Sequence, residues 1–268
     1  MSFSNFLKDI DINLHKSFIL ETFKESNNYL PSKKDYIHKI VETKKYIPNI
    51  FSGLALVREC DKESEIYQFC NSRKLPIDTF PFYFAANFNE WTKGNTDKFI
   101  KCTGKDHSRL IIPWYDRDKK IIGYSARDLD NTQDQKYYRI FVDDEAKEKF
   151  FGIDRLDDSK SHFVCEGEID SLSIDNAIAV SNGKLSIYQH PNAHYIPDGD
   201  YRNKQIMKNT SDLIEAGYKV CLLPDNLPKD LNEMLQNGLT KVEITDIIHQ
   251  NTFQGISARM RFNTLKRI

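Results

Sequence analysis

The sequence predicts an α/β protein, α+β overall, with a largely parallel sheet and flanking helices in its C-terminal half. Two observations predict this class. Short apolar runs alternate with helix-like stretches between residues 161 and 245, and this order is typical of parallel sheets. In addition, acids stand at or just after several of these runs. Open α/β sheets bind their ligands at the carboxyl ends of the strands, so we expect the acids to gather at one edge.

The chain divides into four regions by composition. Residues 1–80 are predicted to be helical, and residues 81–160 form a mixed, basic subdomain. Residues 161–245 form the parallel-sheet unit, and residues 246–268 form a basic C-terminal tail. In the helical region the predicted core positions are Phe18, Ile19, Phe23, Ile37, Ile40 and Val41.

Charge is unevenly distributed although the formal net charge is only −1. Nine Lys and Arg residues lie between Lys101 and Arg139, and residues 251–268 hold four with no acid. The first cluster suits a polyanionic partner; for the tail, ordinary solvated charge stays an alternative. The aromatic run from Phe80 to Phe88 is interpreted as core rather than as a platform for base stacking.

The first acidic motif follows a predicted strand, His162 to Cys165. Glu166 ends the strand, and Gly167 permits a tight turn. Asp170 then opens a helix that is predicted to run through Ala177, and a second strand is predicted from Ala177 to Ser181, closed by Asn182-Gly183. A carboxylate at a strand end and another in the next helical turn can share one metal ion.

Two further acidic motifs follow in the same order of strand and helix. The run from Tyr195 to Pro197 ends at Asp198-Gly199-Asp200, and a long helix is predicted from Asn203 to Glu215, closed by Gly217. Tyr218 to Leu223 reads as the next buried strand, and Asp230 of Lys229-Asp230-Leu231-Asn232 begins the next helix. Converging carboxylates repel one another unless cations neutralise them, so the pattern predicts a metal site.

These motifs resemble a known family. EGxxD at residues 166–170, DxD at 198–200 and KDxN at 229–232 are similar to the Toprim domain of DnaG-type primases, topoisomerases and some nucleases. RLIIP at 109–113, GYSAR at 123–127 and QKY at 135–137 resemble the basic motifs that precede Toprim in primases. The tail, NTFQG followed by ARM, resembles the end of T-even phage DNA primases. The resemblance covers residues 54–268.

The resemblance implies synthesis of short RNA primers on single-stranded DNA during replication, by metal-dependent nucleotidyl transfer from ribonucleoside triphosphates. It implies Mg²⁺ or Mn²⁺ as cofactor, held by oxygen ligands. Glu166, Asp198 and Asp200 are the implied catalytic ligands, and Asp170 and Asp230 the implied supporting ones. Glu168 is a weaker candidate, because the family tolerates other residues there.

The basic motifs imply groups that hold phosphates of the nucleotide or template. The candidates are Arg109, Arg127, Lys136 and Lys229, since arginine offers a planar fork and lysine a point charge. A structural ion pair with nearby aspartates is the alternative for Arg109 and Arg127.

Cysteine spacing predicts that no zinc site is present. Primases of this type begin with a zinc ribbon built from cysteine pairs, whereas none of the five cysteines here has CxxC spacing. We therefore expect the catalytic centre without the ribbon, and weak template choice by the chain alone.

Cellular context follows from composition and resemblance. There is no apolar stretch of membrane-spanning length and no signal-peptide pattern, and scattered cysteines suit a reducing compartment. We expect a cytoplasmic protein of a phage-infected bacterial cell, with the replicative helicase as a partner and no membrane contact. Two rival functions stay open: a Toprim-type nuclease, and a non-catalytic replisome module that binds DNA or helicase.

Overall fold

The computed structural model describes residues 50–95, 105–129, 135–180 and 183–266. Residues 51–268 form one compact unit, to which the following description refers. Most of the predicted helical region, including its predicted core positions, lies outside the described residues.

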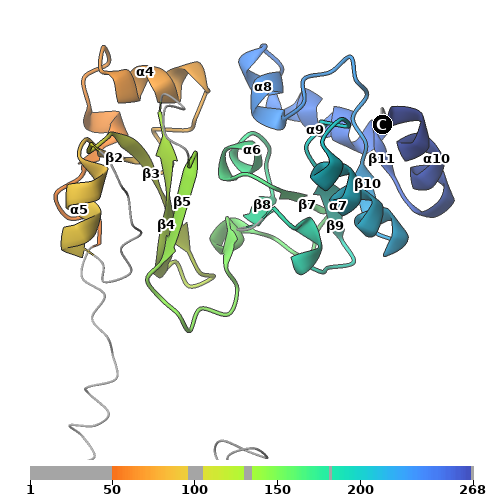
Figure 1. Cartoon of the computed structure of the whole chain (residues 1–268), viewed down its shortest axis with the longest axis horizontal. Coiled ribbons are helices and arrows are strands. Elements are labelled where there is room, and N and C mark those ends of the chain that lie inside the picture. Colours follow the sequence, from red (N-terminus) through yellow and green to blue (C-terminus); the bar gives the residue numbers. More distant parts are fainter. Residues whose placement is uncertain (1–49, 96–104, 130–134, 181–182, 267–268) are drawn as a thin grey trace, which may run out of the picture. The chain divides into compact units, whose positions relative to one another are not determined.

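The first sheet has five antiparallel strands in the order β1-β2-β3-β4-β5. Its long central pair, β3 and β4, is buried along almost its whole length, including the polar residues Arg109, Ser125, Arg127 and Asp128. The helices α4 and α5 and the short 3-10 helix η1 belong to the same part of the chain (Figure 1). The bounds are β1 Ala55–Leu56, η1 Val57–Glu59, α4 Glu65–Ser72, β2 Tyr83–Ala85, α5 Phe88–Asn95, β3 Arg109–Tyr115, β4 Ile121–Asp128 and β5 Tyr137–Phe141.

The second sheet has six strands in the order β11-β10-β9-β7-β8-β6. Its four central strands are mutually parallel, as predicted, and the short edge strands β6 and β11 are antiparallel to their neighbours. The bounds are β6 Phe150–Phe151, η2 Ile153–Arg155, β7 His162–Cys165, α6 Glu168–Leu172, β8 Ala177–Val180, η3 Leu185–Ile187, β9 Ala193–Ile196, α7 Lys204–Glu215, β10 Lys219–Cys221, α8 Leu231–Gln236, α9 Lys241–Gln250, β11 Thr252–Phe253 and α10 Gly255–Leu265.

Alternating strand residues of the second sheet serve two cores. Val164 belongs to a core shared with α7 and α10, whereas its neighbours Phe163 and Cys165 belong to a core shared with α8 and α9. This alternation follows from the two-residue period of a strand. Helices therefore cover both faces of the sheet, which is the arrangement that parallel strands require (Figure 1).

A third core joins the two sheets. Leu110, Ile112 and Trp114 of β3 share it with Ile169 and Leu172 of α6. The aromatic run from residue 80 to 88 contributes its buried members here or nearby, with Phe82 and Phe88 at 1% and 0% exposure. The interpretation of that run as core is confirmed for these residues.

One predicted helix is wrong in length. The helix expected to run through Ala177 is α6, which ends at Leu172. Ala177 begins β8, Ala177–Val180, and this confirms the strand that was also predicted from this residue. The chain reverses at Asn176, whose φ of 52° is left-handed. The Asn176 amide donates to the carbonyls of Asp157 and Ser161, so this turn is fixed by side-chain hydrogen bonds that a helical period does not reveal.

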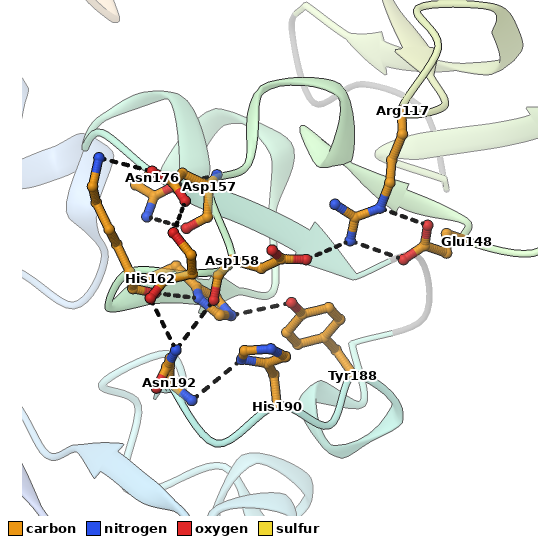
Figure 2. A network of polar contacts seen from close by, with 11 residues as sticks. Arg117, Glu148, Asp157, Asp158, His162, Asn176, Tyr188, His190 and Asn192 are labelled. Atoms are coloured by element: carbon orange, nitrogen blue, oxygen red, sulfur yellow. Dashed lines mark hydrogen bonds and ion pairs between the residues drawn. The ribbon is translucent and has the colours of Figure 1, made fainter.

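The amino-terminal ends of β7 and β9 are joined by a polar network (Figure 2). His162 bonds through its two ring nitrogens to the Lys160 carbonyl and the Tyr188 hydroxyl. Arg117, from the β3–β4 turn, forms a two-pronged contact with Glu148 and a third contact with Asp158. The acidic motifs lie at the opposite, carboxyl ends of the strands, so this network supports the sheet away from them.

Candidate active site

Glu166 follows the last residue of β7 and is partly buried. Its Oε1 atom is buried without a hydrogen-bond partner among the described residues. Burial and the neighbouring Asp198 raise the pKa of Glu166 to about 7, while the backbone N–H of Asp198 opposes this shift. A carboxylate with an unused buried oxygen beside a second carboxylate favours a cation.

Asp170 lies in α6, one turn after Glu166. Its Oδ1 accepts the backbone N–H of Asn232 at 3.0 Å, which brings the first acidic motif to the start of α8. Burial, followed by the charge of Asp230, raises the pKa of Asp170 to about 7. The structure thus brings together Asp170 and Asp230, which are 60 positions apart in the sequence.

The DxD motif follows β9. Pro197 stands one residue beyond the strand's last residue, where the missing N–H costs no ladder bond. The Gly199 N–H donates to the Lys229 carbonyl at 2.9 Å, which joins this turn to the KDxN motif. Asp198 is partly buried, and burial and Asp230 raise its pKa whereas Lys229 and Lys136 oppose the rise.

Asp200 and Asp230 have different surroundings. Asp200 is exposed, and its Oδ1 accepts the backbone N–H of Arg202 at 3.2 Å. Asp230 is the N-cap of α8, as predicted, and its Oδ1 accepts the Glu233 N–H at 2.8 Å. One oxygen of Asp230 is therefore already used by the helix.

A small pocket of about 10 Å³ opens among these acids. This is close to the volume that one water centre needs, so the pocket fits an ion or a water and not a nucleotide. It is lined by Cys165, Glu166, Asp170, Ile196, Pro197, Asp198, Leu223, Lys229, Asp230 and Leu231. Four predicted ligands share the pocket, and Asp200 is absent from its lining.

The donor set fits a hard divalent cation that keeps much of its hydration. In the described part of the chain, no three His, Cys, Asp or Glu side chains are arranged to hold one ion together. Mg²⁺ is ordinarily held by one or two carboxylates, with waters and substrate phosphates completing the shell. Oxygen ligands and the unused Glu166 Oε1 agree with such an ion.

Lys136, which directly precedes β5, lies near the acids, and Arg127 of β4 lies near Lys136. Arg127 of β4 is 2% exposed, its Nε has no hydrogen-bond partner among the described residues, and its guanidinium lies 4.8 Å from the centre of the Tyr137 ring. Lys136 is exposed; partial burial and then the positive charges of Arg127 and Arg73 lower its pKa. Lys136 lies close enough to the acids to oppose the pKa rise of Asp198.

Arg109 has a different environment. It is fully buried, and its guanidinium donates to the carbonyls of Ala126 and Gln135, both at 2.9 Å. It also lies 4.4 Å from the centre of the Tyr138 ring. These contacts hold the side chain in place without a phosphate.

Arg73 and Asn232 were not predicted as site residues. The Asn232 amide donates to the Arg73 carbonyl at 2.8 Å, and its Oδ1 accepts from Arg73 Nη1 at 3.3 Å. Burial and then Arg127 lower the pKa of Arg73, whereas Asp230 and Asp170 oppose this. Asn232 stands in the KDxN motif and could have been predicted from it. No motif in the sequence around Arg73 indicated a role in the site.

Comparison with known proteins agrees with this description. No family model matches the chain. The catalytic domain of DnaG primase bound to single-stranded DNA aligns with a TM-score of 0.56 and 18% identity, over 78% of this chain and 77% of that one. The E. coli primase catalytic core aligns with a TM-score of 0.53 and 19% identity, over 75% of this chain and 76% of that one. The fold is therefore that of the DnaG primase catalytic core.

A relative at the level of sequence is the DNA primase of Enterobacteria phage T4. It is 28% identical over 277 residues, which is 98% of this chain and 78% of the relative. The predicted resemblance to DNA primases of the T-even phage and DnaG-like type is confirmed by this match and by the fold.

Proposed function

We propose that this chain is a DNA primase that synthesises short RNA primers on single-stranded DNA during replication. The observation that carries the proposal is the meeting of three acidic motifs at one edge of the second sheet, with Lys136 nearby and Arg127 of β4 beside Lys136. Nucleotidyl transfer needs carboxylates to hold the metal ions and basic side chains to contact phosphates, because the reacting phosphates and the template are anionic.

The proposed metal ligands are Glu166, Asp198 and Asp200, with Asp170 and Asp230 in support. The proposed ion is Mg²⁺ or Mn²⁺, which when bound neutralises phosphate charge and lowers the pKa of an attacking hydroxyl. The shared pocket and the unused Glu166 oxygen support Glu166 and Asp198 directly. Asp200 is exposed and its charge raises the pKa of Asp198, so its proposed role is to contact a nucleotide or a second ion beside Asp198.

The proposed phosphate-binding groups are Arg127, Lys136 and Lys229, to which the geometry adds Arg73. Arg127 supports this with an unpaired buried Nε, and Lys136 and Lys229 with exposed ammonium groups. For Arg109 the buried hydrogen bonds support a structural role instead.

The proposed partners are single-stranded DNA template, ribonucleoside triphosphates and a replicative helicase. One solved relative of the fold is a DnaG catalytic domain bound to single-stranded DNA, and another is a primase domain in complex with double-stranded DNA. The helicase and the host cytoplasm stay predictions. Among the described residues no helix is long and apolar enough to cross a bilayer.

The proposed domain division keeps the parallel-sheet unit at 161–245. The described strands suggest two adjustments to it. Residues 55–56 already pair with β2 of the first sheet, and residues 150–151 pair with β8 of the second. The proposed tail supplies the end of α9, β11 and α10.

One assay separates primase from its two rivals. The chain is incubated with single-stranded DNA, labelled ribonucleotides and Mg²⁺ or Mn²⁺, with and without helicase, and Asp198→Asn serves as the matched control. Short RNA that requires the metal and is lost in the variant supports the proposal. Shortened DNA would identify a nuclease, and DNA binding without any product would identify a non-catalytic module.

A further inference from the structure

Glu168 is a buried charged residue that touches the first sheet. Its side chain is fully buried. Arg139 of β5 donates through Nε to Oε1 at 2.8 Å and through Nη2 to Oε2 at 3.1 Å. The Ser125 hydroxyl of β4 donates to Oε1, and Ser125 in turn accepts from Trp114 Nε1 at 3.0 Å. Two strands of the first sheet therefore hold one carboxylate of α6.

The place of Glu168 in the chain makes this contact consequential. It stands two residues after Glu166 and two before Asp170, and it begins α6, the helix that follows Glu166 and carries Asp170. An isolated helix of five residues is unstable, because the conformational entropy lost in forming its first turn exceeds the free energy gained from its hydrogen bonds. The position of α6 must come from tertiary contacts, which include Ile169 and Leu172 in the shared core, the bond from the Asn232 N–H to Asp170 and the carboxylate of Glu168.

Stability alone is a poor explanation for such a pair. Desolvating two charges costs about as much as their attraction returns, so apolar side chains of similar volume would often hold two sheets together as well. A two-pronged Arg–carboxylate contact instead supplies direction, because both partners are planar and both hydrogen bonds must align. A short segment that carries two metal ligands requires such a fixed orientation.

We propose that Glu168, held by Arg139 and Ser125, is a positioning residue that sets the separation and orientation of Glu166 and Asp170 for metal binding. The inference rests on the proposed function, since it assumes that those acids bind a divalent cation. It assigns to the first sheet a part in building the metal site, in addition to holding phosphates. Residues that orient metal ligands typically change affinity roughly 10–100-fold when altered.

The test compares Glu168→Gln with Glu148→Gln. Glu148 also meets an arginine in a two-pronged contact, but in the network at the other end of the sheet (Figure 2). Mn²⁺ alone is the probe, and its binding is measured by calorimetry and as the rise in Tm that it produces. We expect Glu168→Gln to weaken Mn²⁺ binding by roughly tenfold or more. Glu148→Gln should lower Tm equally with and without metal and leave the Mn²⁺ affinity unchanged.

Arg139→Lys is the second variant, in case Glu168→Gln fails to fold. It keeps the positive charge but removes the planar guanidinium that makes two hydrogen bonds to Glu168. The proposal therefore requires that Arg139→Lys, like Glu168→Gln, bind Mn²⁺ more weakly than the parent. In primer synthesis both variants should raise the half-saturating metal concentration more than the KM for nucleotide. A full Mn²⁺ affinity in either folded variant overturns the positioning role. If the parent chain itself binds no Mn²⁺, the metal site of the proposed function fails instead.

Discussion

Gly167 lies directly against the carboxylate of Asp170: a Cβ at Gly167 would come within 2.9 Å of Asp170 Oδ2. The other oxygen, Oδ1, is tied to the Asn232 N–H at 3.0 Å. The carboxylate thus has little freedom to move away without losing a bond. Gly167 has a φ of −114°, so its backbone does not require glycine and the reason for glycine here is space.

Gly167→Ala should therefore impair the site more than the fold. At a permitted φ the change stabilises by about 0.4–1 kcal/mol because it restricts the unfolded chain, and this offsets part of the cost of displacing Asp170 from the Asn232 N–H. The displaced Asp170 should reduce primer synthesis and Mn²⁺ affinity. Urea unfolding gives the free energy, and calorimetry gives the affinity. A variant with parental Mn²⁺ affinity would show that Asp170 tolerates displacement.

Much of this site could be predicted from the sequence, because the acids stand beside short apolar runs whose order fixes a parallel sheet. The meeting of Glu166, Asp170, Asp198 and Asp230 follows from that topology alone. The contacts of Glu168 could not be predicted. They join β4, β5 and α6 across 43 and 29 positions, and no local period encodes such a pairing.

The surroundings of the basic residues could likewise not be predicted from local sequence patterns. Arg109 and Arg127 stand in similar motifs on paired strands, and pattern alone gave them one role. In the structure Arg109 is satisfied by backbone carbonyls, whereas Arg127 keeps a buried Nε without a partner. The difference arises from neighbouring loops and rings, which become visible only in three dimensions.

Glu166→Gln and Asp198→Asn should each reduce primer synthesis by roughly 100-fold or more, which corresponds to about 3 kcal/mol of transition-state stabilisation. Loss of a metal ligand removes charge neutralisation from the transition state and leaves core packing intact. Product formation is measured by gel, and circular dichroism checks the fold. Near-normal synthesis by either folded variant would remove that residue from the site.

Stability without metal should depend on the charge of Glu166. Its pKa is raised to about 7 in the folded chain, against an ordinary value of 4.5. The folded state therefore binds this proton more tightly than the unfolded state. The stability that protonated Glu166 contributes is fully present below pH 4.5 and is lost as the pH rises through 7.

Glu166→Gln should consequently be more stable than the parent at pH 8 in the presence of a chelator, and the gap should close toward pH 5. Each pKa unit corresponds to about 1.4 kcal/mol, and partial exposure reduces the effect. Adding Mg²⁺ at pH 8 should reverse the order, because only the parent keeps the full ligand set. Tm measured at both pH values, with and without metal, checks this; a variant less stable than the parent at pH 8 without metal contradicts it.

Arg127→Ala and Lys136→Ala should raise the KM for nucleotide or weaken DNA binding in a salt-dependent manner. Each removed phosphate contact should reduce the slope of log affinity against log salt by about 0.7 on single-stranded DNA. Fluorescence anisotropy over a range of salt concentrations measures the slope. Lys62→Ala is the control, because Lys62 is exposed in the turn that precedes α4. Kinetics and slopes equal to those of the control would exclude a phosphate role for both residues.

Arg109→Ala should lower the stability of the fold and leave the KM for nucleotide and the salt slope unchanged. Removing the guanidinium leaves the Ala126 carbonyl in the buried interior and the part-buried Gln135 carbonyl without this donor, and an unsatisfied buried group costs about 1–3 kcal/mol. The free energy of unfolding should therefore fall by about 3 kcal/mol, while the folded fraction keeps the parental KM and salt slope. Urea unfolding and kinetics below the melting transition separate the two quantities. A stable Arg109→Ala with a raised KM would instead return Arg109 to the phosphate-binding group, and would mean that the β3–β4 pair opens to admit a substrate phosphate.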